Sequence, residues 1–358
     1  MKIKFQEIIR IVCFGAVFLL LLTWLSNVFI PKWEGKRNAA VKVASFYRQP
    51  TDSIDVLFIG ASSFRSGLSP LLMWEQNGIT SYLRVSSRQS PVVSYYYLTE
   101  ALKTQSPKLV VLDAISLFQE NDVDELEPYY RNSIDPMKLS VEKTMIASYI
   151  ASHSETQNVI SYWFPLLRYH SRWKEITADE FRYSFIKDYD YLRGAFPDFT
   201  NTPLEFPADY MAQVGETAQA EDDALLYFQK TIELCQKNHI QVMLLTIPRL
   251  TWTYAKHAAV QQLADQYGLI YLDYSFPEFI SEIGLNAATD FYDQNHLNVL
   301  GSSKISINLG TFLQETYGLP DRRNDDGYES WNVDLQRYAE FLSENGLSHL
   351  SITQSGKY

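Results

Sequence analysis

The segment from Asp55 to Ser63 constrains the fold of this 358-residue chain more than any other stretch. It contains the apolar run Val56–Ile59, which stops abruptly at small residues. A short apolar run of this kind is typical of a buried parallel strand, and the small residues after it allow a tight corner. In open α/β sheets, ligands bind at the carboxyl ends of the strands. The segment therefore predicts a strand that carries Ser62 to a sheet edge where a ligand can approach.

Strand-like and helix-like segments alternate along much of the chain. Apolar runs predict strands at 55–59, 81–85, 109–114, 241–246 and 269–273. Capping signals and apolar periodicity predict helices at 70–77, 91–103, 224–238, 253–267 and 301–317. Such alternation implies a parallel sheet with right-handed crossovers. We therefore predict an α/β fold with a flavodoxin-like, doubly wound parallel sheet over residues 53–318.

Residues 118–222 interrupt this alternation. The stretch is too long for a loop in a compact domain and is rich in aromatic residues. An apolar helical face between Met137 and Ser152 predicts that it contains helices, and we expect an inserted helical cap over the sheet edge. The tail at 319–358 is predicted to dock on the domain through a helical stripe of Trp331, Leu335, Tyr338 and Leu342.

The run from Ile11 to Ile30 is twenty residues long and uncharged, which is the length of helix that the hydrocarbon core of a bilayer requires. We predict that residues 1–31 form a cytoplasmic tip and a membrane-spanning anchor, followed by a stalk at 32–52. The alternative is a cleaved signal peptide, whose apolar core is shorter and ends in a small-x-small cleavage site. No such site follows the run, which favours an uncleaved anchor.

Basic residues on the two sides of this run set its expected orientation. Lys2, Lys4 and Arg10 precede it, so the positive-inside rule predicts a cytoplasmic N-terminus and an extracytoplasmic domain. Basic residues at 32, 36 and 37 weaken the charge difference between the two sides.

The composition argues against several classes of function. Thirty-one basic and forty-two acidic side chains give a net charge of −11, which disfavours a nucleic-acid-binding surface. The two cysteines, Cys13 and Cys235, predict no disulfide. No metal site or cofactor is predicted, because four histidines show no ligand spacing with cysteines or carboxylates: His153, His239, His257 and His349.

Two motifs far apart in the sequence carry the candidate chemistry. Gly60-Ala-Ser62 supplies a hydroxyl at the predicted strand end, and Asp293-Gln-Asn-His296 supplies an imidazole and a carboxylate that can orient it. With these motifs the chain resembles the SGNH (GDSL-like) hydrolase superfamily over the five predicted strands and their order. The resemblance implies that Ser62 is the nucleophile, His296 the general base and Asp293, in preference to Asp290, the residue that orients it. The alternative is that Ser62 is simply a small residue at a tight turn and that His296 is a structural histidine.

Within that superfamily, the anchored topology looks most like the extracytoplasmic group that includes the D-alanyl transfer protein of the teichoic acid pathway and envelope O-acetyltransferases. This resemblance implies a serine esterase or acyltransferase acting on an acyl ester of a cell-envelope polysaccharide or teichoic-acid-like polymer. It implies the membrane bilayer as a partner and allows a membrane-embedded acyl-transfer partner. The alternative is a catalytically weak binding or scaffold component of an envelope-modification complex.

The chain departs from the family pattern at the oxyanion hole. Members supply a glycine after strand two and an asparagine in a Gly-x-Asn-Asp segment after strand three. Here those places hold Val85-Ser-Ser-Arg88 and Asp113-Ala-Ile-Ser116. Donors to a developing oxyanion are therefore expected from the Ser62 backbone, Ser87 and Ser116.

A second candidate site lies inside the 118–222 segment. Two guanidinium groups, an imidazole and two rings occur within six residues: Arg168, Tyr169, His170, Arg172 and Trp173. Such a group suits an anionic or sugar-like substrate through bidentate hydrogen bonds and stacking. The alternative is a solvated surface whose long side chains cover apolar neighbours.

Overall fold

The computed structural model describes residues 5–33, 35, 38–119, 122–185, 189–212 and 217–348. Contacts between these residues define two compact units. We call the first the helical unit, which comprises described residues of 1–44 and 123–189. The second is the sheet unit, which comprises described residues of 45–122 and 190–358.

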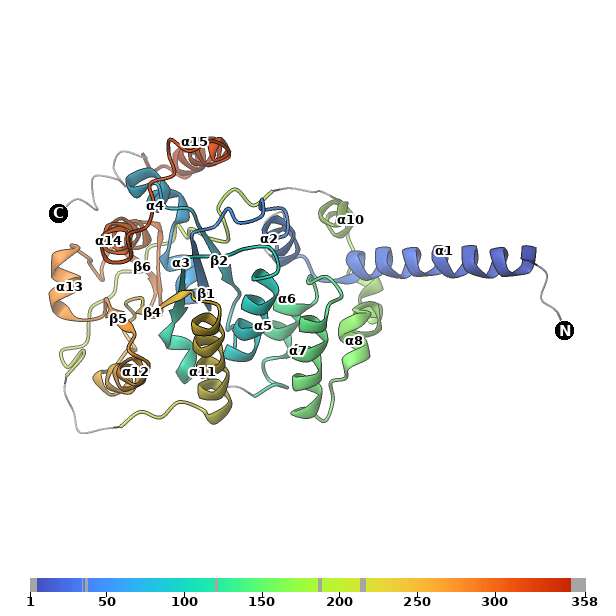
Figure 1. Ribbon diagram of the computed structural model, residues 1–358, viewed down its shortest axis with the longest axis horizontal. Helices are drawn as coiled ribbons and strands as arrows, with labels where there is room; N and C mark the ends of the chain where they lie inside the picture. Colours follow the sequence, from blue (N-terminus) through green and yellow to red (C-terminus); the bar gives the residue numbers. More distant parts are fainter. Residues whose placement is uncertain are drawn as a thin grey trace. The chain divides into compact units, whose positions relative to one another are not determined.

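The sheet unit is built on five parallel strands in the order β2-β1-β3-β4-β5. Figure 1 shows the sheet with helices around it. This order is that of a flavodoxin-like doubly wound sheet, so the predicted fold class is confirmed. The strands begin and end within a residue or two of the predicted positions: β1 (Val56–Gly60), β2 (Ser81–Val85), β3 (Leu109–Asp113), β4 (Gln241–Thr246) and β5 (Ile270–Asp273).

Alternate residues of each strand enter two separate cores, because successive side chains point to opposite faces of a sheet. Val56 and Phe58 of β1 pack in one core, whereas Leu57 and Ile59 pack in the other. Since both faces are covered, the strands are apolar almost throughout. Helices, one 3₁₀ helix and a short hairpin complete the unit: α3 (Ser62–Gly67), α4 (Pro70–Asn77), α5 (Pro91–Ala101), η2 (Ala114–Phe118), α11 (Asp222–Lys237), α12 (Tyr254–Tyr267), α13 (Pro277–Glu282), β6 (Phe291–Asp293), β7 (His296–Leu297), α14 (Val299–Tyr317) and α15 (Glu329–Glu344).

The boundaries of α4 show how local sequence sets these elements. Pro70 occupies the first helical turn, where its missing N–H costs nothing. Gly78 ends the helix in the left-handed conformation, with φ of 67°. A side chain there would also collide with Asp321, since an added Cβ would lie 1.9 Å from its Oδ1. The predicted helix at 70–77 is thus confirmed at both ends.

The C-terminal helix α15 packs against α4, as the apolar stripe predicts. Its residues Trp331, Tyr338 and Leu342 are buried in the same core as α4. The Trp331 and Trp74 rings stack with centroids 5.3 Å apart. The last residues of the tail, 349–358, lie outside the described part of the chain.

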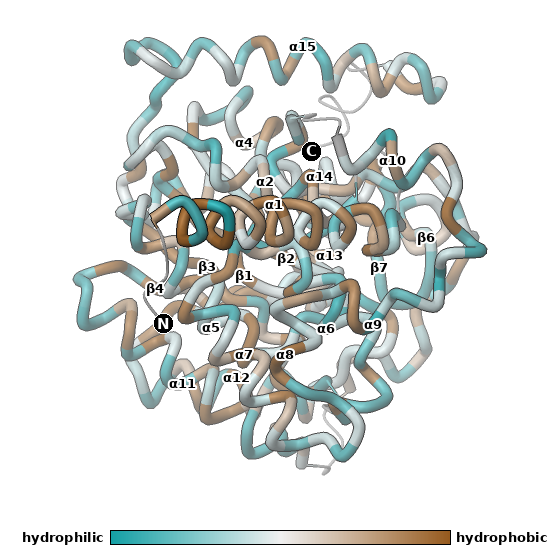
Figure 2. Tube along the Cα trace, turned by 90° about the vertical axis from the view of Figure 1, so that its right-hand side faces the viewer, coloured by the Kyte–Doolittle hydropathy of each residue, from teal (hydrophilic) through white to brown (hydrophobic). Residues whose placement is uncertain are grey.

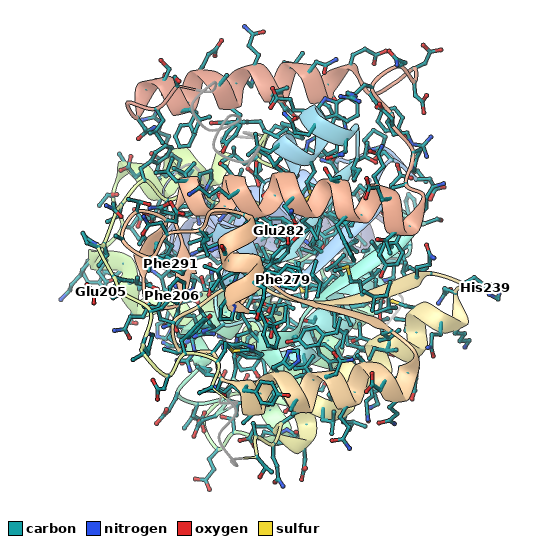
Figure 3. The ribbon with its side chains drawn as sticks, turned by 90° about the vertical axis from the view of Figure 1, so that its left-hand side faces the viewer. Glu205, Phe206, His239, Phe279, Glu282 and Phe291 are labelled. Atoms are coloured by element: carbon teal, nitrogen blue, oxygen red, sulfur yellow. The ribbon has the colours of Figure 1, made fainter. Side chains whose placement is uncertain are left out.

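The segment 190–212 belongs to the sheet unit, which differs from the expected insertion at 118–222. Backbone hydrogen bonds tie it to distant elements: the Leu83 amide donates to the Arg193 carbonyl at 3.0 Å, and the Thr202 amide donates to the Phe291 carbonyl at 3.0 Å. The ring of Phe206 lies 5.9 Å from that of Phe291 in an edge contact (Figure 3). These single contacts impose no periodic pattern, so the sequence alone did not separate this segment from the helices before it.

The helical unit contains the N-terminal helix and most of the aromatic insertion. The helix α1 (Phe5–Phe29) is apolar along most of its length, as the colours of Figure 2 show, and it is long enough to cross a membrane. Several residues that set the predicted orientation lie outside the described residues: Lys2, Lys4, Lys36 and Arg37. The other helices are α2 (Ala39–Phe46), whose last two residues fall in the sheet unit, α6 (Glu127–Ile134), α7 (Val141–Ser152), α8 (Val159–Trp163), α9 (Leu166–Tyr169), η3 (His170–Lys174) and α10 (Ala178–Phe185).

The C-terminal end of α1 is held by side chains of the insertion. The Arg172 guanidinium donates to the Phe29 carbonyl at 2.6 Å, and the Ser184 hydroxyl donates to the Asn27 carbonyl at 3.0 Å. These bonds satisfy carbonyl groups that have no partner within the last turn of a helix. The helix is therefore fastened to the helical unit at this end.

Candidate active site

A tight corner between β1 and α3 presents Ser62 at the carboxyl edge of the sheet. The corner needs glycine at position 60, because a Cβ added there would lie 2.2 Å from the Cβ of Asp113. The Asp113 carboxylate is buried at the end of β3 and accepts hydrogen bonds from the Ala61 amide at 3.1 Å and from the Ser63 hydroxyl. Asp113 thus binds the residues on both sides of Ser62, through the Ala61 backbone and the Ser63 side chain. Burial raises the pKa of its carboxyl group.

The structure brings Ser62, His296 and Asp293 together as one hydrogen-bonded chain. The Ser62 Oγ lies 2.7 Å from His296 Nε2, and His296 Nδ1 lies 2.9 Å from each carboxylate oxygen of Asp293. The backbone N–H of Asn295 donates to Asp293 Oδ1 at 2.7 Å, which fixes the carboxylate. Asp290, the rejected alternative, is buried and forms an ion pair with Lys304 at 2.7 Å.

The surroundings of His296 favour its neutral form. Burial is the main cause that lowers the pKa of the imidazole, and the guanidinium groups of Arg249 and Arg65 lower it further. The Asp293 carboxylate opposes these effects. The ring of Tyr292 stacks on the imidazole with centroids 5.1 Å apart, which limits its rotation. A neutral imidazole held 2.7 Å from a hydroxyl can accept its proton.

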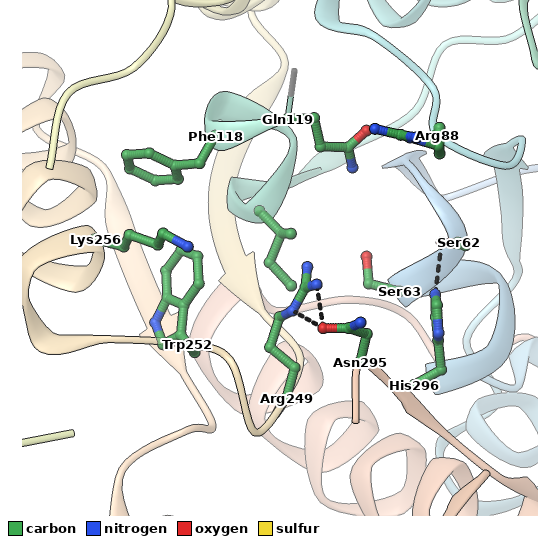
Figure 4. Close-up of a pocket in the computed structure, with 11 residues that line it drawn as sticks. Ser62, Ser63, Arg88, Phe118, Gln119, Arg249, Trp252, Lys256, Asn295 and His296 are labelled. Carbon is green, nitrogen blue, oxygen red and sulfur yellow. Dashed lines mark hydrogen bonds between the residues drawn. The ribbon is translucent and has the colours of Figure 1, made fainter. Parts of the chain in front are cut away.

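A cavity of about 460 Å³ opens beside Ser62 and His296, within the range of small-molecule sites (Figure 4). Its described walls come from the segments after β1, β2, β3 and β4, from α12 and from the β6-β7 turn. All of its lining residues belong to the sheet unit: Ser62, Ser63, Arg88, Ile115, Phe118, Gln119, Arg249, Trp252, Lys256, Asn295 and His296.

The expected oxyanion donors Ser87 and Ser116 do not line this cavity. The Ser116 hydroxyl is buried and donates to the Asp113 carbonyl at 2.7 Å, because it closes the 3₁₀ turn after β3. Their neighbours Arg88 and Gln119, from the same two loops, line the cavity instead. Arg88 has a positive φ of 48°, a conformation that is uncommon for a residue with a side chain.

The predicted substrate-binding cluster lies in the helical unit, and none of its residues lines the cavity. Arg168 donates to both carboxylate oxygens of Glu127, at 2.6 and 3.0 Å. Arg172 contacts two glutamates in addition to the end of α1. Tyr169 is buried, the His170 imidazole contacts the Leu167 carbonyl at 2.9 Å, and Trp173 is exposed.

Sequence reasoning missed seven polar or aromatic residues of the cavity: Arg88, Phe118, Gln119, Arg249, Trp252, Lys256 and Asn295. Arg249 is joined to Asn295, since its Nε donates to Asn295 Oδ1 at 3.1 Å. One signal was present in the sequence. Arg249 comes shortly after the end of β4 at Thr246, much as Ser62 comes shortly after the end of β1 at Gly60, and carboxyl ends of parallel strands meet at one edge.

The fold and site together define a doubly wound α/β protein with a Ser-His-Asp arrangement at the carboxyl edge of its sheet. No protein-family model matches the chain, and no curated protein shows significant sequence similarity to it.

Two solved structures are similar to this chain over much of its length. One is a "putative acylhydrolase" from Bacteroides fragilis NCTC 9343, which is 14% identical with a TM-score of 0.37 over 77% of this chain and 93% of that one. Another is a gut microbial diltiazem-metabolizing enzyme, which is 11% identical with a TM-score of 0.28 over 77% of this chain and 49% of that one. At such low similarity, activity has to be argued from the site of this chain.

Proposed function

We propose that this protein is a serine esterase or acyltransferase of the SGNH type. The observation that carries the proposal is the hydrogen-bonded chain from Ser62 Oγ through His296 to Asp293, at the wall of an open cavity. A serine hydroxyl is a weak nucleophile unless an adjacent base accepts its proton, and a third group commonly orients that base.

The residues support a two-step acyl transfer. Ser62 Oγ attacks the ester carbonyl carbon while its proton passes to His296 Nε2. The bond to the alcohol oxygen then breaks as His296 returns the proton to that oxygen, which leaves an acyl group on Ser62. Water or an acceptor hydroxyl attacks this acyl-serine in the second step and loses its proton to His296. The bond between the acyl carbon and Ser62 Oγ then breaks as His296 returns the proton to Ser62 Oγ. Asp293 stabilises the imidazolium formed in each step.

The oxyanion formed in both steps needs hydrogen-bond donors. We assign this role to the Ser62 backbone N–H and to Arg88 and Gln119, which line the cavity from the loops that hold a glycine and an asparagine in the SGNH family. Replacing Gln119 by alanine should lower kcat by about 10²–10³-fold if its amide is one of these donors.

The cellular setting is part of the same proposal. The length and apolarity of α1 support a single-pass anchor. Together with the sequence resemblance, this favours an extracytoplasmic enzyme acting on an acyl ester of an envelope polysaccharide or teichoic-acid-like polymer. A membrane-embedded acyl-transfer partner is compatible with this setting. Protease added outside intact cells should cleave the sheet unit, whereas protection until the membrane is permeabilised would contradict the orientation.

The test of the proposed chemistry is labelling of the full-length protein by a fluorophosphonate, which reacts with activated serines. We expect label on Ser62, and none in Ser62→Ala or His296→Ala. Ser116→Ala is the matched control, because its hydroxyl contacts only the backbone nearby and lies outside the cavity walls. Full labelling of Ser62→Ala would overturn the proposal.

The alternative is a catalytically weak binding component of an envelope-modification complex. It is favoured by the replacement of the family's glycine and asparagine at the oxyanion positions. A folded protein that binds the envelope polymer but is not labelled by the probe would support this alternative.

A further inference from the structure

The cavity beside Ser62 is lined by three cations: Arg88, Arg249 and Lys256. No carboxylate occurs among the described residues that line it. The two nearest carboxylates are already engaged, because Asp113 accepts the hydrogen bonds of the serine corner and Asp293 contacts His296. The net charge of the chain is −11, so this local excess of positive charge opposes the overall composition.

Arg249 and Lys256 form no ion pair within the described residues, and the Asp113 and Asp293 carboxylates act on Arg249 only at longer range. The Arg249 guanidinium donates to neutral oxygens, the Asn295 amide oxygen at 3.1 Å and the Thr251 hydroxyl at 2.9 Å. The Lys256 ammonium forms no hydrogen bond or ion pair in the part of the chain that the structure describes, and lies 5.9 Å from the centroid of the Trp252 ring.

Both cations are partly buried, which makes this arrangement costly without a ligand. Burial lowers the pKa of Lys256, and repulsion from Arg249 lowers it further. Burial likewise lowers the pKa of Arg249. A buried charge without a counter-ion is unfavourable, whereas an anion between two such cations would gain strong charge-assisted hydrogen bonds.

Arg249 and the Trp252 ring beside Lys256 are held in place by hydrogen bonds. Asn295 Oδ1 accepts from the Thr251 hydroxyl as well as from Arg249, while its Nδ2 donates no hydrogen bond among the described residues. The Trp252 indole donates to Asp273 at 2.8 Å. Because these groups are already ordered, little conformational entropy is lost when a ligand binds.

We propose that Arg249 and Lys256, with the side-chain Nδ2 of Asn295, form an anion subsite. This subsite binds a carboxylate or phosphate carried by the ester substrate or by the acyl acceptor. This assignment rests on the proposed esterase or acyltransferase function. Ile115, Phe118 and Trp252 provide an apolar wall for the carbon skeleton of the same ligand. The cavity volume of about 460 Å³ suits a small anionic ester or a single unit of an anionic polymer.

The kinetic test compares matched neutral and anionic esters with the full-length protein in detergent. One series carries the charge on the acyl side, p-nitrophenyl pentanoate against p-nitrophenyl hemiglutarate. The other carries it on the alcohol side, phenyl acetate against 4-carboxyphenyl acetate and 4-acetoxyphenyl phosphate. We expect at least a tenfold higher kcat/KM for the anionic member in one series. The carboxylate and phosphate probes separate the two anion types.

The variants Arg249→Gln and Lys256→Gln should each lower the ratio of anionic to neutral kcat/KM about tenfold, and Arg249→Lys should retain most of it. Lys237→Gln, which removes an exposed charge at the end of α11, should leave the ratio unchanged. Equal kcat/KM for neutral and anionic esters in the wild-type protein, or an unchanged ratio in both glutamine variants, would overturn the proposal.

A binding measurement separates this subsite from the catalytic proposal. Calorimetric titration of the Ser62→Ala protein with benzoate and with inorganic phosphate requires no turnover. Binding that is lost in Ser62→Ala with Arg249→Gln supports the subsite even if the probe never labels Ser62. Labelling of Ser62 without any anion binding or preference would retain the esterase and overturn the subsite.

Discussion

Arg249 of the sheet unit and the arginines of the helical unit differ in the groups that they contact. In the helical unit, Arg168 and Arg172 are paired with glutamates, and Arg131 is paired with Glu127 and Asp135. Arg84 and Arg193 of the sheet unit also form ion pairs with carboxylates. Arg249 instead reaches the cavity, and its side-chain hydrogen bonds within the described residues go to neutral groups. The partner of a guanidinium group, and not its neighbours in the sequence, therefore decides whether its charge is available to a ligand.

Arg131 is the clearest structural example. Its side chain is buried, donates to the Ser161 carbonyl at 2.8 Å and lies 3.6 Å from the centroid of the Tyr162 ring. Its carboxylate partner Asp135 is also buried. Removing Arg131 takes away the stronger of two cations that stabilise the buried Asp135 carboxylate, whereas removing Arg249 takes away a hydrogen-bond donor to two neutral groups.

The largest expected effect concerns the sheet unit. Ser62→Ala and His296→Ala should each lower kcat/KM for a small ester by at least about 10³-fold, because nucleophile and base act as one unit. Ser63→Ala should retain a substantial part of the activity, since its hydroxyl supports Asp113 and not the reacting carbonyl. Rates measured on proteins with matching circular dichroism spectra would check this, and equal rates for Ser62→Ala and wild type would contradict it.

The next effect separates the structural arginines. Arg131→Ala should destabilise the protein by about 3–5 kcal/mol, because it leaves Asp135 buried without its partner. Arg168→Ala should cost only about 0.2–1 kcal/mol, because the Arg168 side chain is 49% exposed and its ion pair is screened by solvent. Thermal unfolding of both variants measures the difference. An equal loss of stability in Arg131→Ala and Arg168→Ala would contradict this difference between a buried and an exposed ion pair.

The pH dependence of kcat/KM tests the electrostatic role of the cavity cations. Only neutral His296 can act as a base, so activity should rise with pH through its pKa, which lies below the ordinary value of about 6.5. Arg249→Gln should shift this acid limb to higher pH, because Arg249 disfavours the imidazolium. Arg168→Gln, in the helical unit, is the matched control and should leave the limb in place.

The smallest expected effect concerns the predicted substrate-binding cluster. Arg168→Ala combined with Arg172→Ala should leave hydrolysis of a small soluble ester nearly unchanged, because neither side chain lines the cavity. The same variant should be assayed on isolated envelope polymer. A loss of activity on the polymer alone would show that the helical unit binds the acceptor. It would then be wrong that the paired arginines of this unit are unavailable to a ligand.

The sheet was predictable because strands buried on both faces are continuous apolar runs. Such runs occur in β1, β3, β4 and β5, whereas β2 carries the buried Arg84, and β2 and β4 begin and end at the expected residues. Ser62 and His296 were found because a strand end and an Asp-x-x-His spacing are local patterns. Their approach to 2.7 Å across 234 residues follows from the sheet order.

The cavity cations were not predicted, since they depend on contacts between loops. Arg249 is positioned by Asn295, which lies 46 residues away in the sequence. Asking which polar residues follow every predicted strand would have selected Arg88 and Arg249 together with Ser62. The cluster at 168–173 misled for the converse reason, because its partners Glu127 and Glu180 are not part of the local pattern.

The fastening of α1 has a mechanical consequence. Because Arg172 and Ser184 donate hydrogen bonds to the carbonyls of Phe29 and Asn27, this end of the helix cannot rotate independently of the helical unit. If α1 spans the bilayer as proposed, α1 and the rest of the helical unit change orientation together. A change in the tilt of the helix, such as a thicker bilayer would impose, then becomes a rotation of the helical unit above the membrane.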